Sequence, residues 1–275
     1  MATRDLTVVL QVAERAAEAA GELIREWSGR PEVVDTKSGP HDFVTEVDRR
    51  CESVIRETIR DAFPDDFILG EETVAQYGGA EVVLGAEHED LWVVDPIDGT
   101  TNFVAGIPFC SVSIAYAHRG ILEVGMVYHP YLKEQFSAVR SGGAFLNGRP
   151  IRVSSASTLS ESVLGTGFPS GEHARAVNTK GMVDLAPRCR NIRTLGSAAL
   201  HLAYVACGRL TGFWETHLNP WDMAAGALLV QEAGGQVTDI EGRPYTLEVR
   251  HVVGTNGLIH GELLGRLKGA MAAEI

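Results

Sequence analysis

The sequence predicts a mixed α and β fold, and two observations indicate it. Stretches with apolar residues at helical spacing alternate with apolar runs too short to be helices. No repeat of fixed period and no low-complexity tract interrupts this alternation. The chain has 275 residues, of which 45% are hydrophobic, so it is long enough to bury a large core. We therefore expect a single domain over residues 1–275, with two halves of about 1–155 and 156–275.

Two amphipathic helices open the chain. The first is expected over residues 6–27, because its apolar residues recur at helical spacing. The second is expected from about residue 45 to residue 62, with Thr45 as its N-cap and Pro64 as its stop. Between them Val33 and Val34 begin a short extended piece that leads into a loop over residues 37–40.

Strands follow in the first half. Short apolar runs bounded by turn residues predict strands at 67–69, 91–94, 109–117, 121–128, 135–139, 144–146 and 151–153. Pro96 has no N–H, so we expect the strand before it to stop at Asp95. The Asn147-Gly148 pair predicts a type I′ hairpin between the last two strands. We interpret residues 73–90 as a surface loop.

Strands and helices alternate in the second half. The predicted strands are 163–167, 192–194, 212–215, 236–239 and 252–255. The predicted helices are 172–186, 198–207, 220–233 and 259–273. Ser197 is the expected N-cap of the second of these helices, and Pro220 suits the start of the third because a helix needs no N–H there.

Two carboxylates lie where the 91–94 strand ends. Asp95 and Asp98 are three residues apart, and Gly99 and Thr100 follow in a small polar turn. Such a turn leaves N–H groups free beside the carboxylates, which suits a cation bound next to a phosphate. Taken alone, the same string of residues is equally typical of an ordinary surface turn.

Four other acids, in three segments, follow the same pattern. Glu71 and Glu72 come directly after the 67–69 strand, and Asp48 and Asp222 lie at the starts of two helices. An acid at a helix start is more often a cap than a ligand, so neither aspartate alone indicates a site. Together, however, these acids would place several negative charges close to one another.

The four segments together resemble the inositol monophosphatase family. Residues 95–103 and 221–226 are similar to its two signature motifs, and 70–72 and 42–48 to two further motifs, in the same order. The resemblance extends from about Leu6 to the end of the chain. It implies a layered α-β-α-β-α sandwich of the inositol monophosphatase and fructose-1,6-bisphosphatase type, and it implies a homodimer.

The resemblance also implies a metal centre. A first Mg²⁺ would be held by Glu71, Asp95 and the carbonyl of Ile97, and a second by Asp95, Asp98 and Asp222, with two or three ions in each active site. A set of oxygen ligands without His or Cys favours Mg²⁺ over zinc. At an effective dielectric near 20, two like charges ~4 Å apart repel by roughly 4 kcal/mol, so such acids require cations or protons.

Catalytic roles carry over to the same residues. The resemblance implies that Thr100, paired with Asp48, helps to activate the attacking water beside Glu71. Water would attack phosphorus directly, without a phosphoenzyme. Glu72 would lie just outside the ligand set, and Lys37 occupies the basic position of a loop that closes over the metals. An exposed, solvated lysine is an equally good interpretation of Lys37.

The substrate contacts are the third group that the resemblance implies. They are Glu71, Ile97, Asp98, Gly99, Thr100, Gly196, Ser197, Ala198, Glu215 and Asp222. Gly99 and Thr100 would bind phosphate oxygens through their N–H groups, and Glu215 would accept hydrogen bonds from ring hydroxyls. The residues around Glu215 are also consistent with plain strand-end surface.

Charge and cysteine content exclude other classes. The net charge of −12 argues against nucleic acid or an anionic membrane as the main partner, since both require a basic surface. The four cysteines are scattered and form no CxxC pair, so we expect free thiols in a reducing compartment. No apolar run approaches the length of a membrane span, and the first residues have no apolar core of a signal peptide. We expect a cytoplasmic protein.

The family resemblance, with which these observations agree, implies a Mg²⁺-dependent, lithium-sensitive phosphomonoesterase. Its most favoured substrate is myo-inositol monophosphate, within a broader class of polyol phosphates. Histidinol phosphate, fructose 1,6-bisphosphate and a nucleotide 3′-phosphate stay open as alternatives, because fold and motif do not decide among them. A regulatory binding protein that keeps the fold is the alternative from a different class.

Overall fold

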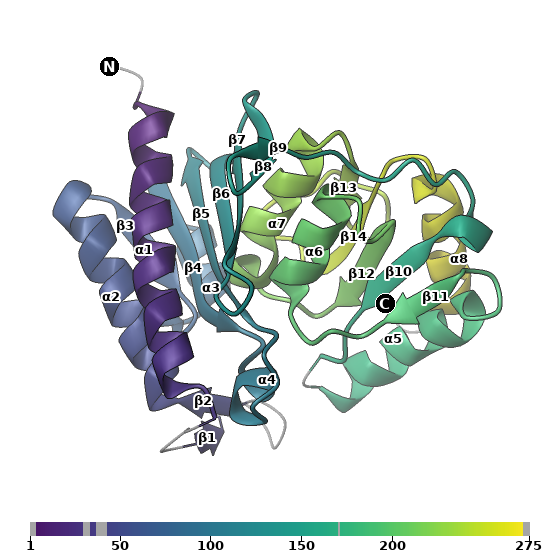
Figure 1. Cartoon of the computed structure of the whole chain (residues 1–275), viewed down its shortest axis with the longest axis horizontal. Coiled ribbons are helices and arrows are strands. Elements are labelled where there is room, and N and C mark those ends of the chain that lie inside the picture. The colour runs from purple at the N-terminus through teal and green to yellow at the C-terminus, as the bar shows by residue number, and fades with distance from the viewer. Residues whose placement is uncertain (1–3, 30–33, 37–42, 170, 272–275) are drawn as a thin grey trace.

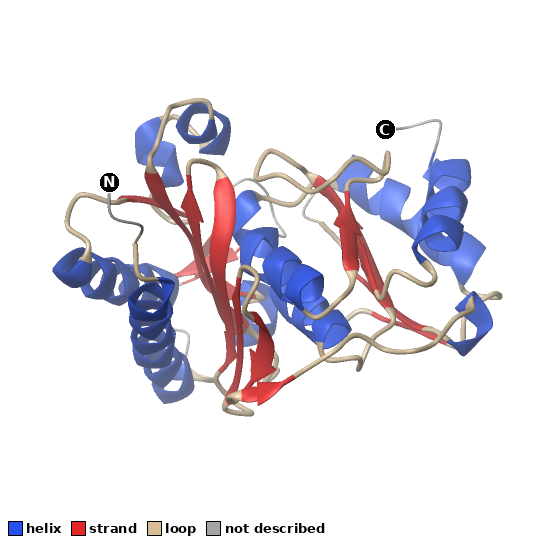
Figure 2. Cartoon of the chain, turned by 90° about the horizontal axis from the view of Figure 1, so that it is seen from above, coloured by secondary structure: helices blue, strands red, loops and turns tan. Residues whose placement is uncertain are grey.

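The computed structural model of the chain is a sandwich of five layers. It describes residues 4–29, 34–36, 43–169 and 171–271. Two helices, a seven-stranded sheet, two more helices, a five-stranded sheet and a final pair of helices follow one another across the molecule (Figures 1 and 2). The expected α-β-α-β-α arrangement is thus confirmed.

The larger sheet is formed by strands in chain order, β3-β4-β5-β6-β7-β8-β9. Their bounds are β3 Phe67–Gly70, β4 Asp90–Asp98, β5 Ser111–His118, β6 Ile121–His129, β7 Glu134–Val139, β8 Gly143–Leu146 and β9 Arg149–Pro150. Only β3 and β4 are parallel, and the other neighbours are antiparallel hairpins. The carboxyl ends of β3 and β4 therefore lie at the same edge of the sheet, which brings their two acidic motifs together.

Helices α1 (Leu6–Trp27) and α2 (Glu46–Ala62) cover one face of this sheet (Figure 2). Their apolar faces pack on side chains such as Trp92 and Ile114 in one hydrophobic cluster. Thr45 caps α2 as the sequence predicts, because its hydroxyl accepts hydrogen bonds from the first turn. Strands β1 (Val34–Thr36) and β2 (Phe43–Thr45) form a separate antiparallel pair before α2.

Helices α6 (Ala198–Ala206) and α7 (Pro220–Glu232) fill the space between the two sheets (Figure 1). Almost every residue of α7 from Trp221 to Val230 is buried, as expected of a helix that is apolar on all sides. This central layer joins the two sheets in one core cluster. The first turn of α7 is thereby fixed between the two sheets.

The smaller sheet has the order β11-β10-β12-β14-β13. Its strands are β10 Val163–Thr166, β11 Asn191–Arg193, β12 Gly212–Thr216, β13 Gln236–Thr238 and β14 His251–Thr255. Helices α5 (Glu172–Leu185) and α8 (His260–Met271) pack on its outer face around Trp214. Within the described residues, no helix is long and apolar enough to cross a membrane.

Three local expectations are wrong. Strand β4 does not stop at Asp95 but continues to Asp98, because a shift in register between them accommodates Pro96. The expected loop at 73–90 contains two short helices, η1 (Val74–Tyr77) and α3 (Ala80–Leu84).

The third error concerns the predicted hairpin. Its turn has the expected left-handed residues, Asn147 with φ 49° and Gly148 with φ 73°. The returning strand, however, is Arg149–Pro150 rather than 151–153. Ile151 and Val153 instead leave the sheet and pack against the central core cluster, where their apolar side chains are partly buried. Short segments after a turn are poorly defined by apolar content alone.

Two additional short elements complete the described chain. Helix α4 (Thr100–Val104) follows the end of β4, and the turn η2 (Leu159–Glu161) precedes β10. Chain segment 151–158 connects the larger sheet to η2 without forming a helix or strand.

The central layer gives a prediction for stability. Leu228→Ala in α7 should lower the free energy of unfolding by about 2–5 kcal/mol, because the side chain is fully buried between the two sheets. Leu132→Ala is the matched control, since Leu132 is 57% exposed and should change stability by less than about 0.5 kcal/mol. Denaturant titration measures both, and equal losses would contradict the packing described.

Candidate active site

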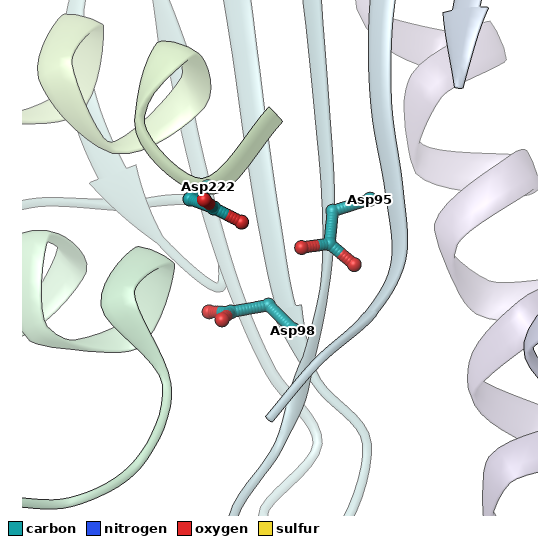
Figure 3. Close-up of side chains that lie close together, drawn as sticks. All are labelled: Asp95, Asp98 and Asp222. Atoms are coloured by element: carbon teal, nitrogen blue, oxygen red, sulfur yellow. The ribbon is translucent and has the colours of Figure 1, made fainter. Parts of the chain in front are cut away.

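Three aspartates from two elements converge at the junction of the sheets. Asp95 and Asp98 lie at the end of β4, and Asp222 lies in the first turn of α7. Each offers a carboxylate oxygen, and these oxygens all lie within 4.8 Å of one another (Figure 3). The sequence predicts this grouping, although the two elements are separated by more than a hundred residues.

Local hydrogen bonds hold each aspartate in place. Asp98 accepts hydrogen bonds from the Ser197 hydroxyl and from the N–H groups of Ala198 and Ala199, at the amino end of α6. Asp222 accepts from the N–H of Asn219 at 2.7 Å in a capping box. One oxygen of Asp95 accepts from the N–H of Ile97 at 3.0 Å, which follows from the bulge in β4.

The carboxylates lie close to one another and are largely buried within the protein. Burial, followed by the charges of Glu71, Asp98 and Asp222, raises the pKa of Asp95 well above its usual value. Burial also raises the pKa of Asp98 to about 6, although the hydrogen bonds from α6 oppose the shift. The pKa of Asp222 is raised by burial and then by Glu71 and Asp98. A proton or a cation bound at each acid would therefore stabilise the folded protein.

Glu71 and Glu72 follow β3 at the same edge of the sheet. The N–H of Glu71 continues the β3–β4 pairing by donating to the carbonyl of Val94 at 3.1 Å. Both glutamates, together with Asp98 and Asp222, line a cavity of about 1130 Å³. Glu71 lies close enough to Asp95 and Asp222 for its charge to raise the pKa of both. This agrees with its predicted position beside the aspartates.

A buried ion pair that the sequence analysis did not identify supports this loop. Glu52 accepts hydrogen bonds from the N–H of Glu72 at 2.7 Å and from the hydroxyl of Thr73 at 2.6 Å. Arg56 lies 3.5 Å from Glu52 and also donates to the carbonyl of Ile68 and to Thr73. Two charged residues on the buried face of an otherwise amphipathic helix were the signal available in the sequence.

Asp48 and Thr100 contact each other as predicted. The Thr100 hydroxyl lies 3.2 Å from Asp48 and 3.0 Å from the carbonyl of Ile97, and it can donate to only one of them at a time. The other oxygen of Asp48 accepts from the N–H and hydroxyl of Thr45. Asp48 is therefore both the capping-box acid of α2 and a neighbour of Thr100.

Gly99 is required where the chain turns from β4 into α4. Its φ is 101°, and a side chain there would meet the carbonyl oxygen of Gly196 at 2.8 Å. Asn102, on the next turn, donates to the carbonyls of Phe109 and Leu195, both at 2.7 Å. It thus ties the first half of the chain to the 195–197 loop, a role that the sequence analysis missed.

The remaining predicted contacts come from the second half of the chain. Gly196, Ser197, Ala198 and Glu215 all line it. Ser197 and Ala198 also donate to Asp98, which their predicted substrate role did not include. Glu215 accepts no hydrogen bond from any described residue, and burial, then Asp222 and Asp98, raise its pKa well above the usual range. Lys37 lies outside the described residues.

The donor set fits a hard cation. Within the described part of the chain, the group that could hold a metal consists only of carboxylates. Oxygen ligands without nitrogen or sulfur favour Mg²⁺. The structure therefore defines a layered α and β protein with a candidate divalent-cation centre between its two sheets.

The chain belongs to the inositol monophosphatase family, whose pattern matches residues 5–272. It is 46% identical over 252 residues to Nus factor SuhB of Pseudomonas aeruginosa, covering 90% of this chain and 91% of the relative. It is 44% identical over 250 residues to inositol monophosphatase 3 of Solanum lycopersicum, covering 90% and 91%. An IMPase of Thermotoga maritima superimposes with a TM-score of 0.87 at 38% identity, covering 97% and 99% of the two chains.

The Glu52–Arg56 pair predicts a loss of stability on truncation. Glu52→Ala should lower the free energy of unfolding by about 3 kcal/mol or more, because it leaves the buried Arg56 without its carboxylate and the Glu72 N–H without its acceptor. Glu57→Ala on the exposed face of α2 is the matched control and should be nearly neutral. Denaturant titration would contradict this account if the two variants lost equal stability.

The raised pKa values predict how Mg²⁺ stabilises the protein. Without metal, the folded state holds a proton on Asp98 up to about pH 6, against 3.8 for the ordinary group, so stability should fall as pH rises between these values. Mg²⁺ held by the same carboxylates would replace the protons and reverse this loss. Millimolar Mg²⁺ should therefore raise Tm by several degrees near pH 7.5 and by much less near pH 5. A thermal shift independent of pH would contradict the assignment.

Proposed function

We propose that this protein hydrolyses a phosphate monoester of a polyol in a Mg²⁺-dependent reaction, with myo-inositol monophosphate as the first candidate substrate. One observation carries the proposal: the oxygens of Asp95, Asp98 and Asp222 lie within 4.8 Å of one another, and two of these residues, Asp98 and Asp222, line an open cavity. Membership of the inositol monophosphatase family supports the same chemistry.

The proposed ligand sets are those that the motifs suggest. Glu71, Asp95 and the carbonyl of Ile97 would hold one ion, and Asp95, Asp98 and Asp222 another, with two or three Mg²⁺ in total. When bound, Mg²⁺ offsets the charge of the phosphate and lowers the pKa of a water molecule. The protein contributes a rigid set of acids, which the hydrogen bonds from α6 and from the bulge of β4 hold in position.

Thr100 and Asp48 would move the proton of the attacking water. The Thr100 hydroxyl lies between two acceptors, the Ile97 carbonyl and Asp48. Once that carbonyl is used as a ligand, the hydroxyl proton points to Asp48, and the Thr100 oxygen can accept a hydrogen bond from water. Attack on phosphorus then proceeds in line without a covalent intermediate on the protein. The N–H groups of Gly99 and Thr100 would bind phosphate oxygens.

Glu215 would bind the alcohol part of the substrate. It lies at the end of β12 within the cavity, and its carboxylate has no hydrogen-bond partner among the described residues. Hydroxyl groups of a polyol would supply the missing donors, with Gly196 and Ser197 beside them. Histidinol phosphate, fructose 1,6-bisphosphate and a nucleotide 3′-phosphate are the other candidate substrates for this cavity.

The organisation of the working protein is also part of the proposal. We expect one domain whose two halves share the cavity, a homodimer, inhibition by Li⁺ and a cytoplasmic location. Each of these rests on family membership rather than on a contact within the chain. Glu72 would support the ligand set without binding a metal directly.

A binding role is the second candidate function. It is favoured by the 46% identity to a relative that carries the name Nus factor SuhB. All the acids of the proposed centre are nevertheless retained, which favours catalysis. The two roles are separable, because a variant without metal ligands would lose hydrolysis and keep its surface.

Asp222→Asn tests the catalytic proposal. The amide keeps an oxygen for the N–H of Asn219 but removes the charge, so turnover of inositol 1-phosphate should fall by roughly 10²–10³-fold with the fold intact. Asp65→Asn, on an exposed turn, is the matched control and should be as active as the natural protein. Phosphate release measures both, and calorimetry should show weaker Mg²⁺ binding only for Asp222→Asn. Unchanged turnover in that variant would refute the centre.

A further inference from the structure

The cavity that holds the acids also has a basic wall. Arg175 of α5, His217 at the end of β12 and Arg250 just before β14 all line it. All three belong to elements of the five-stranded sheet and its outer helix, whereas the aspartates Asp95 and Asp98 come from β4. The chain has 36 acidic and 24 basic residues, so its average composition does not account for three basic residues on one wall of the cavity.

The two arginines have unused donors. The Nε of Arg250 is buried without a hydrogen-bond partner, and its one acidic neighbour among the described residues, Glu81, lies 3.9 Å away and is 91% exposed. Arg175 donates from Nε to the carbonyl of Pro169 at 2.8 Å, and no described carboxylate forms an ion pair with it. Guanidinium groups present several donors in a plane, which suits phosphate or carboxylate.

The histidines around Arg250 add to the basic character. The rings of His217 and His251 lie 4.9 Å apart, and that of His173 lies 6.1 Å from His217. The N–H of His217 donates to Nδ1 of His251, which the left-handed φ of 59° at His217 makes possible. Burial and the neighbouring positive charges lower the pKa of both His217 and His251. Burial is the larger cause of both shifts, and the charge of Asp239 opposes the shift of His251, so the ring distances are what show how close these basic groups lie.

The negative charges of the metal centre do not balance the positive charges of this wall. When ionised, Glu71, Asp95, Asp98 and Asp222 carry four negative charges, and two Mg²⁺ would balance them completely. Glu215 lines the same cavity, but neither Arg175 nor Arg250 forms an ion pair with it, so both arginines keep donors for an added anion. A ligand that extends from the acids to this wall can supply that anion, because both groups of residues line the same cavity.

We propose that Arg175, His217 and Arg250 form a second anion subsite, and that the preferred substrate is a polyol phosphate with a phosphate or carboxylate at its other end. This inference rests on the proposed function, because the first phosphate is placed at the metal centre. It separates the candidate substrates. A neutral polyol monophosphate leaves the subsite empty, a second anionic group fills it, and the protonated amine of histidinol phosphate is repelled.

Three matched compounds test the subsite. Glucitol 6-phosphate has a neutral far end, 6-phosphogluconate has a carboxylate there, and glucitol 1,6-bisphosphate has a phosphate. With the natural protein and Mg²⁺, KM should be at least about tenfold lower for one or both compounds with two anionic groups, since one charge-assisted hydrogen bond accounts for such a ratio. The better of these two compounds identifies the anion. Equal KM values for all three compounds would overturn the proposal.

Variants then assign the effect to the two arginines. Arg175→Gln with Arg250→Gln should raise KM for the compounds with two anionic groups about tenfold or more, with kcat and the KM for glucitol 6-phosphate within about twofold. Arg49→Gln, which alters the same cavity from α2, is the matched control and should not change the ratio. An equal rise in KM for all three compounds in the double variant would show that the arginines act through the overall electrostatic potential of the cavity and not through contact with a second anionic group. That result would overturn the subsite.

Calorimetry separates this inference from the proposed function. If neither inositol 1-phosphate nor any of the three compounds is hydrolysed, the proposed function fails, and titration of the three compounds into the natural protein and the double variant decides the subsite alone. The subsite predicts a Kd ratio of about tenfold or more between the anionic and neutral compounds, lost in the double variant. A ratio of one in the natural protein would refute the subsite.

Discussion

The rest of this structure depends on keeping like charges together in a buried place. Two carboxylates ~4 Å apart repel by roughly 4 kcal/mol at an effective dielectric of 20, so other interactions of the fold must offset this repulsion. It does so with N–H donors, from Ala198 and Ala199 to Asp98, from Asn219 to Asp222 and from Ile97 to Asp95. These N–H donors do not cancel the charge of any of the three aspartates. Burial and the remaining repulsion between the acids therefore keep the pKa of each aspartate raised.

This constraint explains why the two sheets are joined by a layer of helices. Asp98 belongs to β4 of the larger sheet, but its hydrogen-bond donors belong to α6, which packs between the sheets. Asn102 makes a second link, from α4 to the carbonyl of Leu195. The 195–199 segment is therefore fixed by side chains from the other half of the chain. A change in the packing of α6 would move the N–H donors of Asp98, and a change in the packing of α7 would move Asp222 itself.

The sequence was informative where a pattern has one physical cause. Helices α1 and α2, the cap at Thr45 and the meeting of Glu71 with the aspartates all follow from periodicity, capping and recognisable motifs. It was less informative where tertiary contacts decide. The bulge that carries β4 past Pro96 depends on pairing with β5, and the departure of Ile151 from the hairpin depends on burial against the central core. Asn102 gave no local signal, because its partners are carbonyl groups of other segments. Glu52 and Arg56 gave only a weak one, two charged residues on the buried face of α2, and the N–H of Glu72 that Glu52 accepts from lies on another segment.

The difference between Glu52 and Asp95 shows how a buried acid can be interpreted. Both are 1% exposed. Glu52 has an arginine, an N–H and a hydroxyl around it, so its charge and its oxygens are satisfied within the protein, and its role is structural. Asp95 has one N–H and otherwise faces other acids. A fold tolerates such an acid only if something outside the chain supplies the positive charge. Arg250 differs from Asp95, because its side chain is 41% exposed and only its Nε is buried without a partner. The buried acids therefore carry the inference of a bound cation, whereas the proposed anion subsite rests on the unused donor of Arg250 and on the cavity that it lines.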